Sequence, residues 1–326
     1  MPNDMQPGLN KNVLLLESLT PDTEQVLHNH VQVFKVLSPT SGGEVAVRQP
    51  VHAIITRGLG AVNAELIKQC HGLEIIARAG VGLDNVDVEF ATAQGIKVIN
   101  APGSNADTVA EHTLALMLAL QRRLYTSIEA VKDNRWDYRK SYGGDEIRGK
   151  ILGILGMGNI GRRVAQLAQA FGMDIWYASQ KPADVPYNLV SFKKLLVQAD
   201  IISLHLPLTS QTRNLLNRAS IAQLQPHTLI INTSRGEVID QQALTEALLD
   251  KKIGGFAADV LIQEPPAVDD VLLKLDNVLV TPHSASLTGR TYHQMCLLTV
   301  QNTLSLLRSE AIDEKYIFNR QHLGGF

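Results

Sequence analysis

Cysteine is scarce in this chain of 326 residues, which contains only Cys70 and Cys296. Neither belongs to a CxxC pair or to another metal-ligand spacing, and a disulfide framework would require more cysteines. We therefore expect both thiols to be reduced, ordinary side chains, as is usual in the cytoplasm. This scarcity excludes the disulfide-stapled class of small secreted domains.

A strong charge imbalance and long hydrophobic runs are also lacking. Thirty Lys and Arg against 32 Asp and Glu give a formal net charge of −2, so nothing indicates a surface for nucleic acid or for anionic membranes. The first apolar run, residues 13–16, is far too short for a signal-peptide core or a membrane span. The sequence predicts a cytoplasmic protein whose partner is a small molecule, with neither nucleic acid nor membrane as partner.

Apolar residues are abundant, at 45% of the chain, and occur in short runs. Between residues 13 and 101 the runs VLLL, AIIT, LEIIA and KVIN alternate with amphipathic stretches at 21–30, 63–70 and 87–94. A second series begins at residue 151 and includes DIWYA, DIISLHL, TLIINTS, GGFAADV and NVLVTP, before a helical stretch at 287–308. This alternation predicts an α/β protein with parallel sheets, and the length suggests two domains.

Residues 107–124 predict a helix that is apolar on most sides from Leu114 to Leu120. Such a helix must be covered on more than one face. It is either an ordinary core helix or a hinge helix that also packs against a second subunit. Periodicity alone does not separate these two interpretations.

Residues 151–161, ILGILGMGNIG, lead from an apolar run into a GxGxxG motif. In such a motif Gly156 permits a tight turn, Gly158 lets the backbone approach a pyrophosphate, and Gly161 lets the next helix pack closely. The helix that opens at Asn159 and Ile160 offers unpaired N–H groups to a diphosphate. A lone GxGxxG is often only a turn, but the strand-like run before it and the helical spacing after it favour a dinucleotide site.

Three other predicted strands are each followed by a residue whose side chain can take part in binding or catalysis. Arg235 follows TLIINTS, Glu264 follows GGFAADV, and His283 follows NVLVTP. Taken one at a time, Arg235 is more often a surface cap, Glu264 a charged loop residue and His283 an ordinary histidine. Because ligands of doubly wound sheets bind beyond the carboxyl ends of the strands, the three together favour a dehydrogenase with a carboxylate anchor, a pKa-tuning group and a proton donor.

The segments NTSRGEVID, AADV with EPP, and TPHSAS resemble signatures of the D-isomer-specific 2-hydroxyacid dehydrogenases, and the likeness extends along nearly the whole chain. RAGVGLDNVD, NAPGSNADTVAEHTLALMLAL and GKILGILGMGNIG are most similar to the phosphoglycerate dehydrogenase and hydroxypyruvate reductase branch. The resemblance implies a Rossmann-type doubly wound domain at 103–287, inserted into a flavodoxin-like substrate domain of 1–102 and 288–326. It also implies a homodimer, which we expect to form through 107–124 and 132–150 with Trp136 as a candidate anchor.

The resemblance further implies that Arg235 binds the substrate carboxylate and carbonyl oxygen. His283 donates a proton to that oxygen as hydride reaches C2, and Glu264 orients His283 and favours its imidazolium form. The backbone N–H groups of Val81 and Gly82 resemble a second clamp for the carboxylate. The further cofactor-binding residues expected are His205, Pro207, Thr233 and Asp259, of which Asp259 faces the nicotinamide carboxamide. We expect Asn232 and Thr281 to be scaffold, and we expect no metal.

Two arginines bear on the substrate. The phosphoglycerate branch uses the positions of Arg57 and Arg78 to reach a distal phosphate, and both are arginine here. An arginine at a strand end is usually a solvated charge, but a pair beside the substrate loop suits an anionic tail because guanidinium matches phosphate and carboxylate geometry. A simple keto acid such as glyoxylate is the alternative.

The chain departs from the family pattern after DIWYA. A member that prefers NAD has Asp at the position of Ser179, where it binds the ribose 2′-hydroxyl. Here Ser179, Gln180 and Lys181 can instead hydrogen-bond and neutralise a 2′-phosphate, so we expect NADP to be preferred and NAD to remain a usable cofactor. The alternative is a neutral turn that accepts either cofactor.

The predicted activity is hydride transfer between a nicotinamide cofactor and C2 of a 2-keto or D-2-hydroxy acid. An unusual donor such as phosphite or formate is an alternative. A dinucleotide-sensing corepressor or scaffold is another, because it could retain Arg235, Glu264 and His283.

Overall fold

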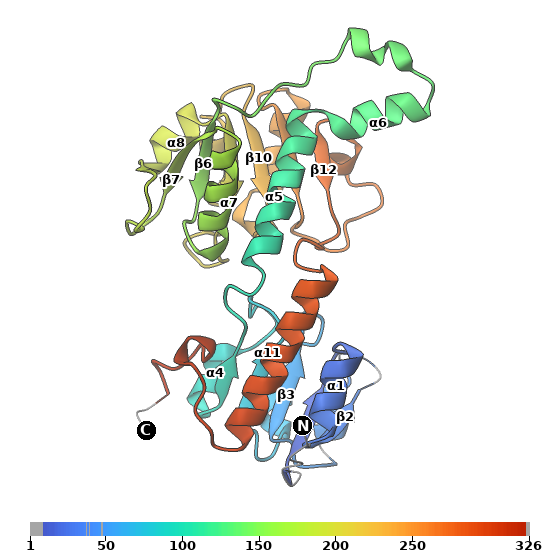
Figure 1. Ribbon diagram of the computed structural model, residues 1–326, viewed down its shortest axis with the longest axis vertical. Helices are drawn as coiled ribbons and strands as arrows, with labels where there is room; N and C mark the ends of the chain where they lie inside the picture. Colours follow the sequence, from blue (N-terminus) through green and yellow to red (C-terminus); the bar gives the residue numbers. More distant parts are fainter. Residues whose placement is uncertain (1–8, 37, 39, 47, 324–326) are drawn as a thin grey trace, which may run out of the picture. The chain divides into compact units, whose positions relative to one another are not determined.

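The computed structural model describes residues 9–323 apart from 37, 39 and 47. The chain divides into two compact units (Figure 1). The discontinuous unit comprises Met1–Asn105 and Leu287–Phe326, and the inserted unit comprises Ala106–Ser286. The sequence predicts these boundaries at 102/103 and 287/288.

The discontinuous unit is built on a five-stranded parallel sheet with the order β2-β1-β3-β4-β5, which is the flavodoxin-like order. Its strands are β1 (Asn12–Leu15), β2 (Gln32–Lys35), β3 (Ala53–Thr56), β4 (Ile75–Arg78) and β5 (Lys97–Ile99). Its helices are α1 (Pro21–His28), α2 (Gly42–Ala46), α3 (Ala64–Gln69), α4 (Val88–Ala93) and α11 (Gly289–Leu307), with a short 3-10 turn η4 (Glu314–Tyr316). Helix α11 runs along this sheet beside α1 (Figure 1).

Alternating residues of the interior strand β1 enter two different cores. Val13 and Leu15 pack in the cluster that includes Val300 of α11, whereas Leu14 packs with Ile67 of α3 on the opposite face. Because both faces are covered, the strand is a continuous apolar run and not an alternating one.

The inserted unit holds a seven-stranded parallel sheet with the order β12-β11-β10-β9-β6-β7-β8. Its strands are β6 (Ile151–Leu155), β7 (Asp174–Ala178), β8 (Asn188–Leu189), β9 (Ile201–Leu204), β10 (Leu229–Asn232), β11 (Gly255–Ala258) and β12 (Val278–Val280). The helices are α5 (Ala106–Gln121), α6 (Leu124–Lys132), α7 (Asn159–Ala170), α8 (Phe192–Gln198), α9 (Arg218–Ile221) and α10 (Gln241–Leu249), and the 3-10 turns are η1 (Trp136–Lys140), η2 (Gly236–Val238) and η3 (Val271–Lys274). The strand order reverses between β6 and β9, where a doubly wound sheet binds its ligand.

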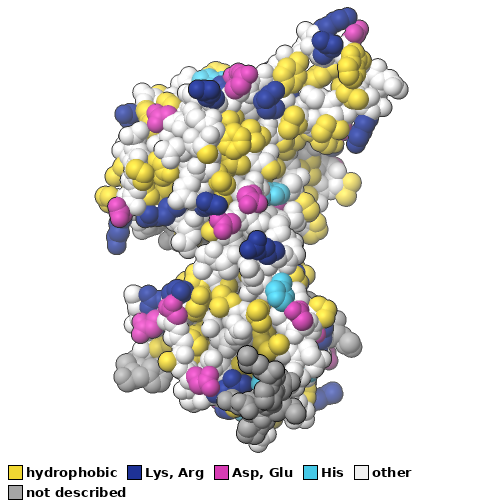
Figure 2. Space-filling model, in the orientation of Figure 1, with side chains coloured by type: hydrophobic (Ala, Val, Ile, Leu, Met, Phe, Trp, Pro, Cys, Tyr) yellow, Lys and Arg dark blue, Asp and Glu magenta, His cyan; other side chains and the backbone are white. Residues whose placement is uncertain are grey.

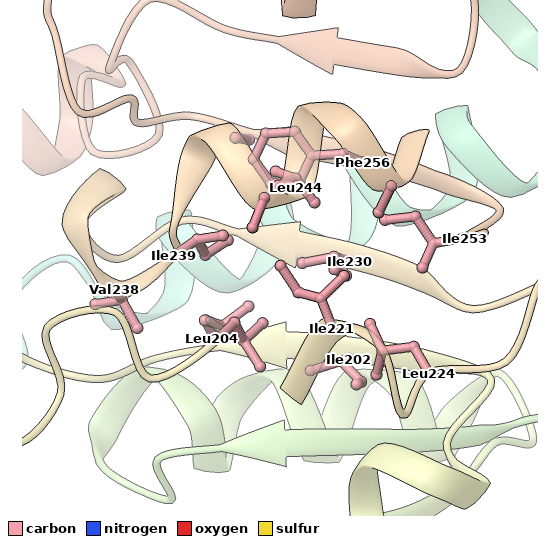
Figure 3. Packing of buried hydrophobic residues seen from close by; sticks show 14 of the residues in the cluster. Ile202, Leu204, Ile221, Leu224, Ile230, Val238, Ile239, Leu244, Ile253 and Phe256 are labelled. Atoms are coloured by element: carbon pink, nitrogen blue, oxygen red, sulfur yellow. The ribbon is translucent and has the colours of Figure 1, made fainter. Parts of the chain in front are cut away.

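Helices cover both faces of the inserted sheet. On one face Ile202, Ile230 and Phe256 of three adjacent strands pack with Ile221 of α9 and Leu244 of α10 (Figure 3). Burial of each such side chain stabilises the fold by about 1.5–3 kcal/mol. Helices α5 and α7 cover the other face, and α5 packs against β10, β11 and β12 (Figure 1).

The prediction of a single helix over 107–124 was wrong at its C-terminal end. Helix α5 stops at Gln121, Arg123 adopts a left-handed backbone with φ of 48°, and α6 begins at Leu124. Helix α6 and η1 form an arm that extends beyond the sheet (Figure 1). The arm carries hydrophobic side chains at its surface (Figure 2), including Ile128 at 53% and Trp136 at 66% exposure.

Candidate active site

The three glycines of the turn between β6 and α7 have different surroundings. Gly156 has φ of +98°, and a Cβ added there would lie 2.4 Å from the carbonyl oxygen of His205. A Cβ on Gly161 would lie 2.1 Å from the carbonyl oxygen of Gly156, which is why α7 can begin so close to the strand. A Cβ on Gly158 would meet nothing within 4 Å, so this glycine faces open space.

Helix α7 begins at Asn159 without a side-chain cap on its first turn. The backbone N–H groups of Asn159 and Ile160 belong to that turn. The N–H groups in the first turn of a helix have no acceptor within the helix. The open face of Gly158 and the positive end of the helix dipole complete a cradle for an anion. These residues therefore fit the pyrophosphate of a dinucleotide.

His205 follows β9 and lies against the glycine turn. Its Nε2 is 2.8 Å from the Ser203 hydroxyl, while Nδ1 is buried with no hydrogen-bond partner among the described residues. Burial lowers the pKa of His205 to about 3, so the ring is neutral at physiological pH. Pro207, two residues later, is exposed and accepts a hydrogen bond from the Thr212 hydroxyl at its carbonyl oxygen.

The loop after β7 exposes Ser179, Gln180 and Lys181 together. The Gln180 amide donates to the Gln211 side chain at 2.7 Å. Sequence reasoning missed Arg162, whose guanidinium reaches from α7 to the Asp184 carbonyl oxygen at 2.7 Å, in the segment that follows β7. Its position directly after the last glycine of the motif is the signal that could have identified it.

His283 and Glu264 form a close pair in the inserted unit. His283 Nδ1 lies 2.6 Å from Glu264 Oε2, and the second carboxylate oxygen accepts the backbone N–H of Leu261 at 2.9 Å. With Nδ1 bonded to the carboxylate, Nε2 of the ring remains for another partner, and it carries a proton when the ring is charged. The His283 side chain is 52% exposed, so a ligand can reach it.

The pair shifts both ionisation equilibria toward the charged forms. The hydrogen bond to Glu264 raises the pKa of His283, and the negative charges of Glu264 and Asp259 raise it further. Burial and the positive charge of Arg235 lower this pKa but do not cancel the rise. For Glu264, burial is the largest influence and raises its pKa. The bonds from His283 and the Leu261 N–H, with the charges of His283 and Arg235, outweigh burial and leave the pKa below its ordinary value.

Arg235 lies on the loop after β10 and is held by that loop. Its Nη1 donates to the Ser234 carbonyl oxygen at 2.7 Å. The Asn232 amide donates to the Arg235 carbonyl oxygen at 2.9 Å, while Asn232 Oδ1 accepts the Ser234 N–H and hydroxyl. Asn232 therefore fixes the loop from which the guanidinium projects.

Asp259 follows β11 and is 2% exposed. Its Oδ1 accepts the Thr281 hydroxyl at 2.6 Å and the Ser284 N–H at 2.8 Å, and its Oδ2 accepts the Ala285 N–H at 2.8 Å. These bonds hold the segment on both sides of His283, which has a left-handed backbone with φ of 52°.

The four residues expected to bind substrate belong to the discontinuous unit. Arg57 follows β3, stacks over the Tyr292 ring at 4.8 Å and donates to the Tyr292 hydroxyl at 3.1 Å. Arg78 ends the neighbouring strand β4. Its guanidinium fills the space that a Cβ on Gly80 would occupy, and it lies within 4 Å of the position that a Cβ on Gly58 would take. Both arginines thus belong to the same carboxyl edge of the sheet.

Val81 and Gly82 follow Arg78 in the loop after β4. The Val81 carbonyl oxygen accepts the Asn100 amide at 2.6 Å, which anchors this loop to the end of β5. Sequence reasoning missed Glu17, whose Oε2 accepts the backbone N–H groups of residues 57–60 at 2.8–3.0 Å. Its position shortly after the apolar run of β1, at a strand end, is the signal that could have found it.

Within the described part of the chain, no group of three or more His, Cys, Asp or Glu side chains is arranged to hold a metal ion. The described helices also include none with the length and apolar character needed to cross a bilayer.

Comparison with known proteins identifies the family to which the chain is similar. Residues 114–285 match the model of the D-isomer specific 2-hydroxyacid dehydrogenase NAD binding domain. The chain is 42% identical over 256 residues to a hydroxypyruvate reductase of Thermotoga maritima, covering 77% of this chain and 83% of that protein. It is 34% identical over 302 residues to a D-3-phosphoglycerate dehydrogenase of Archaeoglobus fulgidus, covering 91% of this chain and 57% of the archaeal protein.

A solved structure is similar along almost the entire length. It is the NADPH-dependent glyoxylate/hydroxypyruvate reductase of Sinorhizobium meliloti in complex with citrate, with a TM-score of 0.85, 28% identity, and coverage of 93% of this chain and 97% of that one. The family model covers more than half of the chain and the Thermotoga relative covers most of it. This chain therefore belongs to the family of D-isomer-specific 2-hydroxyacid dehydrogenases.

Proposed function

We propose that this chain reduces a 2-keto acid with an anionic tail to the D-2-hydroxy acid, with NADPH as the preferred cofactor. Hydride transfer between a nicotinamide cofactor and C2 of a 2-keto acid is the chemistry of its family. The observation that carries the proposal is the His283–Glu264 pair, 2.6 Å apart, in the sheet unit that also holds the glycine turn. A charged imidazole there can supply the proton that ketone reduction requires.

Each side chain of the site has a separate task. A dinucleotide held by its pyrophosphate at the glycine turn, with its nicotinamide beside Asp259, would supply hydride to C2. His283 gives its Nε2 proton to the carbonyl oxygen, and Glu264 stabilises the imidazolium before transfer and holds the ring in place. Arg235 binds the substrate carboxylate, for which its guanidinium offers parallel donors. In the reverse direction neutral His283 accepts the hydroxyl proton.

The anionic tail is inferred from Arg57 and Arg78. They lie at the ends of neighbouring strands in register, Thr56 opposite Arg78, and Tyr292 holds the Arg57 guanidinium in one orientation. Two oriented guanidinium groups suit a phosphate or a second carboxylate. Arg57→Ala should therefore raise KM for phosphohydroxypyruvate about tenfold or more and leave glyoxylate nearly unaffected. Equal effects on both substrates would contradict the proposed tail.

The preference for NADPH is inferred from the loop after β7. Ser179 and Lys181 are exposed there without an acidic residue between them, and Arg162 is bonded to the same segment. Each good charge-assisted bond to a 2′-phosphate contributes roughly 1.5–3 kcal/mol, so a preference of about tenfold is expected. Ser179→Asp should move selectivity toward NADH by repulsion of the phosphate. A wild-type kcat/KM ratio that favours NADH would contradict the preference.

A homodimer is inferred from the arm. Leu124, Ile128, Val131 and Trp136 each expose between 44% and 66% of their surface on this one projecting segment (Figure 2). A cluster of exposed apolar residues on a monomer marks an interaction surface, and the same surface on a second copy is the simplest partner. Light scattering at micromolar concentration should give twice the mass of one chain. A monomeric mass would contradict this.

A further inference from the structure

Two neighbouring loops and one helix meet around Arg57 in the discontinuous unit. Arg57 begins the loop after β3, Glu17 lies on the loop after β1, and Tyr292 lies in the first turn of α11. Strands β1 and β3 are parallel neighbours, so the two loops leave the same edge of the sheet side by side. The guanidinium of Arg57 contacts Tyr292 and its backbone N–H contacts Glu17. Arg57 is therefore restrained at two points.

The phenol of Tyr292 has a fixed direction of hydrogen bonding. Its hydroxyl lies 2.8 Å from the Ser18 carbonyl oxygen, which can only accept, so the phenol donates its one proton there. The phenol oxygen is left to accept from Arg57 Nη1 at 3.1 Å. Burial, the largest influence, raises the pKa of Tyr292 and outweighs the charge of Arg57, so the phenol keeps this proton at physiological pH. The ring face attracts the guanidinium as well, with Cζ 4.8 Å from the ring centroid.

These contacts leave one edge of the guanidinium available to a ligand. Both hydrogen bonds from the Arg57 side chain to described residues start at Nη1, one to Tyr292 and one, at 3.5 Å, to the Ser18 carbonyl oxygen. Nε and Nη2 form another edge of the group, with two parallel N–H donors. This is the edge that two oxygens of a phosphate or carboxylate match. Tyr292 thus orients Arg57 without occupying the donors that an anion needs.

Glu17 fixes the backbone from which Arg57 projects. Its Oε2 accepts the N–H groups of residues 57–60 at 2.8–3.0 Å, so the loop is wrapped around one carboxylate oxygen. Burial is the largest influence on Glu17 and raises its pKa, but the four N–H bonds outweigh burial and leave the pKa below its ordinary value. Because hydrogen bonds to a charged acceptor are about twice as strong as neutral ones, a neutral side chain would hold this loop less firmly.

We propose that Tyr292 and Glu17 are positioning residues that hold Arg57 with its Nε–Nη2 edge open to the anionic tail of the substrate, and that they thereby set the selectivity for substrates with such a tail. The inference rests on the proposed function, which assigns the tail to Arg57 and Arg78. The two arginines end neighbouring strands and carry like charges, so an unrestrained Arg57 would turn away into solvent. The restraints remove that freedom before the substrate binds.

Tyr292→Leu and Glu17→Gln test the two restraints separately. Immobilising one long side chain costs about two- to tenfold in affinity. Each variant should therefore raise KM for phosphohydroxypyruvate by about that factor, with kcat unchanged and no more than the rise caused by Arg57→Ala. Tyr292→Phe keeps the ring and loses the hydroxyl, so its rise should be smaller than that of Tyr292→Leu. KM for glyoxylate, which has no tail, should change less than about twofold.

His293→Ala is the matched control on the same helix. His293 is the next residue of α11, but its ring contacts Asp22 at 3.2 Å and Thr20 at 3.4 Å. The change should leave KM for both substrates unaltered. A rise for phosphohydroxypyruvate as large as that of Tyr292→Leu would show that any disturbance of this helix end has the effect, and would overturn the inference.

A double-mutant cycle with Arg57→Ala separates positioning from general damage. If Tyr292 and Glu17 act through Arg57, then neither Tyr292→Leu nor Glu17→Gln should raise KM for phosphohydroxypyruvate further once residue 57 is alanine. A change that merely deforms the unit would multiply with the effect of Arg57→Ala. Multiplied effects would therefore overturn the inference.

The outcomes distinguish the inference from the function on which it rests. If Arg57→Ala raises KM for phosphohydroxypyruvate alone, while Tyr292→Leu or Glu17→Gln leaves it unchanged, the inference is overturned and the proposed function stands. Equal rises for both substrates in Tyr292→Leu also overturn the inference alone. If Arg57→Ala affects both substrates equally, or if the wild-type protein reduces neither, the proposed function fails together with the inference.

Discussion

Replacement of Gly158 by alanine should weaken dinucleotide binding without weakening the fold. Gly158 has an ordinary backbone, with φ of −82° and ψ of −160°, and an added Cβ would meet nothing within 4 Å. The methyl group would therefore occupy only the space in front of the first turn of α7. That is the space that a pyrophosphate must enter to reach the N–H groups of the turn.

The two effects differ in size. Alanine caps a helix less well than glycine, which costs up to about 1 kcal/mol, but it also restricts the unfolded chain by about 0.4–1 kcal/mol. The free energy of unfolding should thus change by less than about 1 kcal/mol. Loss of one charge-assisted bond to the pyrophosphate costs about 1.5–3 kcal/mol, which raises the Kd for NADPH roughly 10- to 150-fold.

Gly156→Ala and Gly161→Ala are the matched controls. Their added Cβ atoms would lie 2.4 and 2.1 Å from backbone oxygens, and Gly156 also has a positive φ. Both changes should therefore reduce the free energy of unfolding in urea by about 1–3 kcal/mol or more. Wild-type affinity for NADPH in Gly158→Ala, measured by calorimetry, would refute a dinucleotide site at this turn. A loss of stability as large as that of Gly161→Ala would refute the assigned geometry.

Three further changes test the proposed catalytic pair, His283 and Glu264, and the arm. His283→Gln should lower kcat about 10²–10⁴-fold while the Kd for NADPH stays unchanged; full turnover would show that another group donates the proton. Glu264→Gln removes the carboxylate that raises the pKa of His283, so the proton is lost at lower pH and the alkaline limb of keto-acid reduction should move toward acid; an unmoved limb would contradict the pairing. Ile128→Asp on the arm should give monomers in light scattering, whereas Val268→Asp at a fully exposed loop position should leave the mass unchanged; dimers with Ile128→Asp would place the interface elsewhere.

Buried strands and the glycine turn were predictable because their signals are local. The run ILGIL becomes β6, and α7 begins at Asn159, directly within the motif. Strand β2 was not predicted because it lies at the sheet edge and its residues are only partly buried, so no apolar run marks it. The break after α5 was also missed, since Arg123 takes its left-handed backbone without a glycine or proline to signal it.

The supporting contacts of the site could not be read from periodicity. Strand-end positions pointed to Arg235, Glu264 and His283, and the structure pairs the last two. His112 and Thr281 are separated by 169 residues, and Thr281 was expected to be scaffold. Partners so distant in sequence are brought together by the packing of α5 on the sheet, which a local pattern does not encode.

Isotope transfer tests the central claim most directly. The protein would be incubated with NADPH carrying two deuterium atoms at C4 of the nicotinamide, and with phosphohydroxypyruvate, hydroxypyruvate or glyoxylate. Products would be analysed by mass spectrometry, and by chiral separation where C2 becomes a stereocentre. We expect one deuterium at C2, the D isomer from the first two substrates, and the highest kcat/KM for phosphohydroxypyruvate. An L product, or no deuterium at C2 from any of the three, would contradict the account.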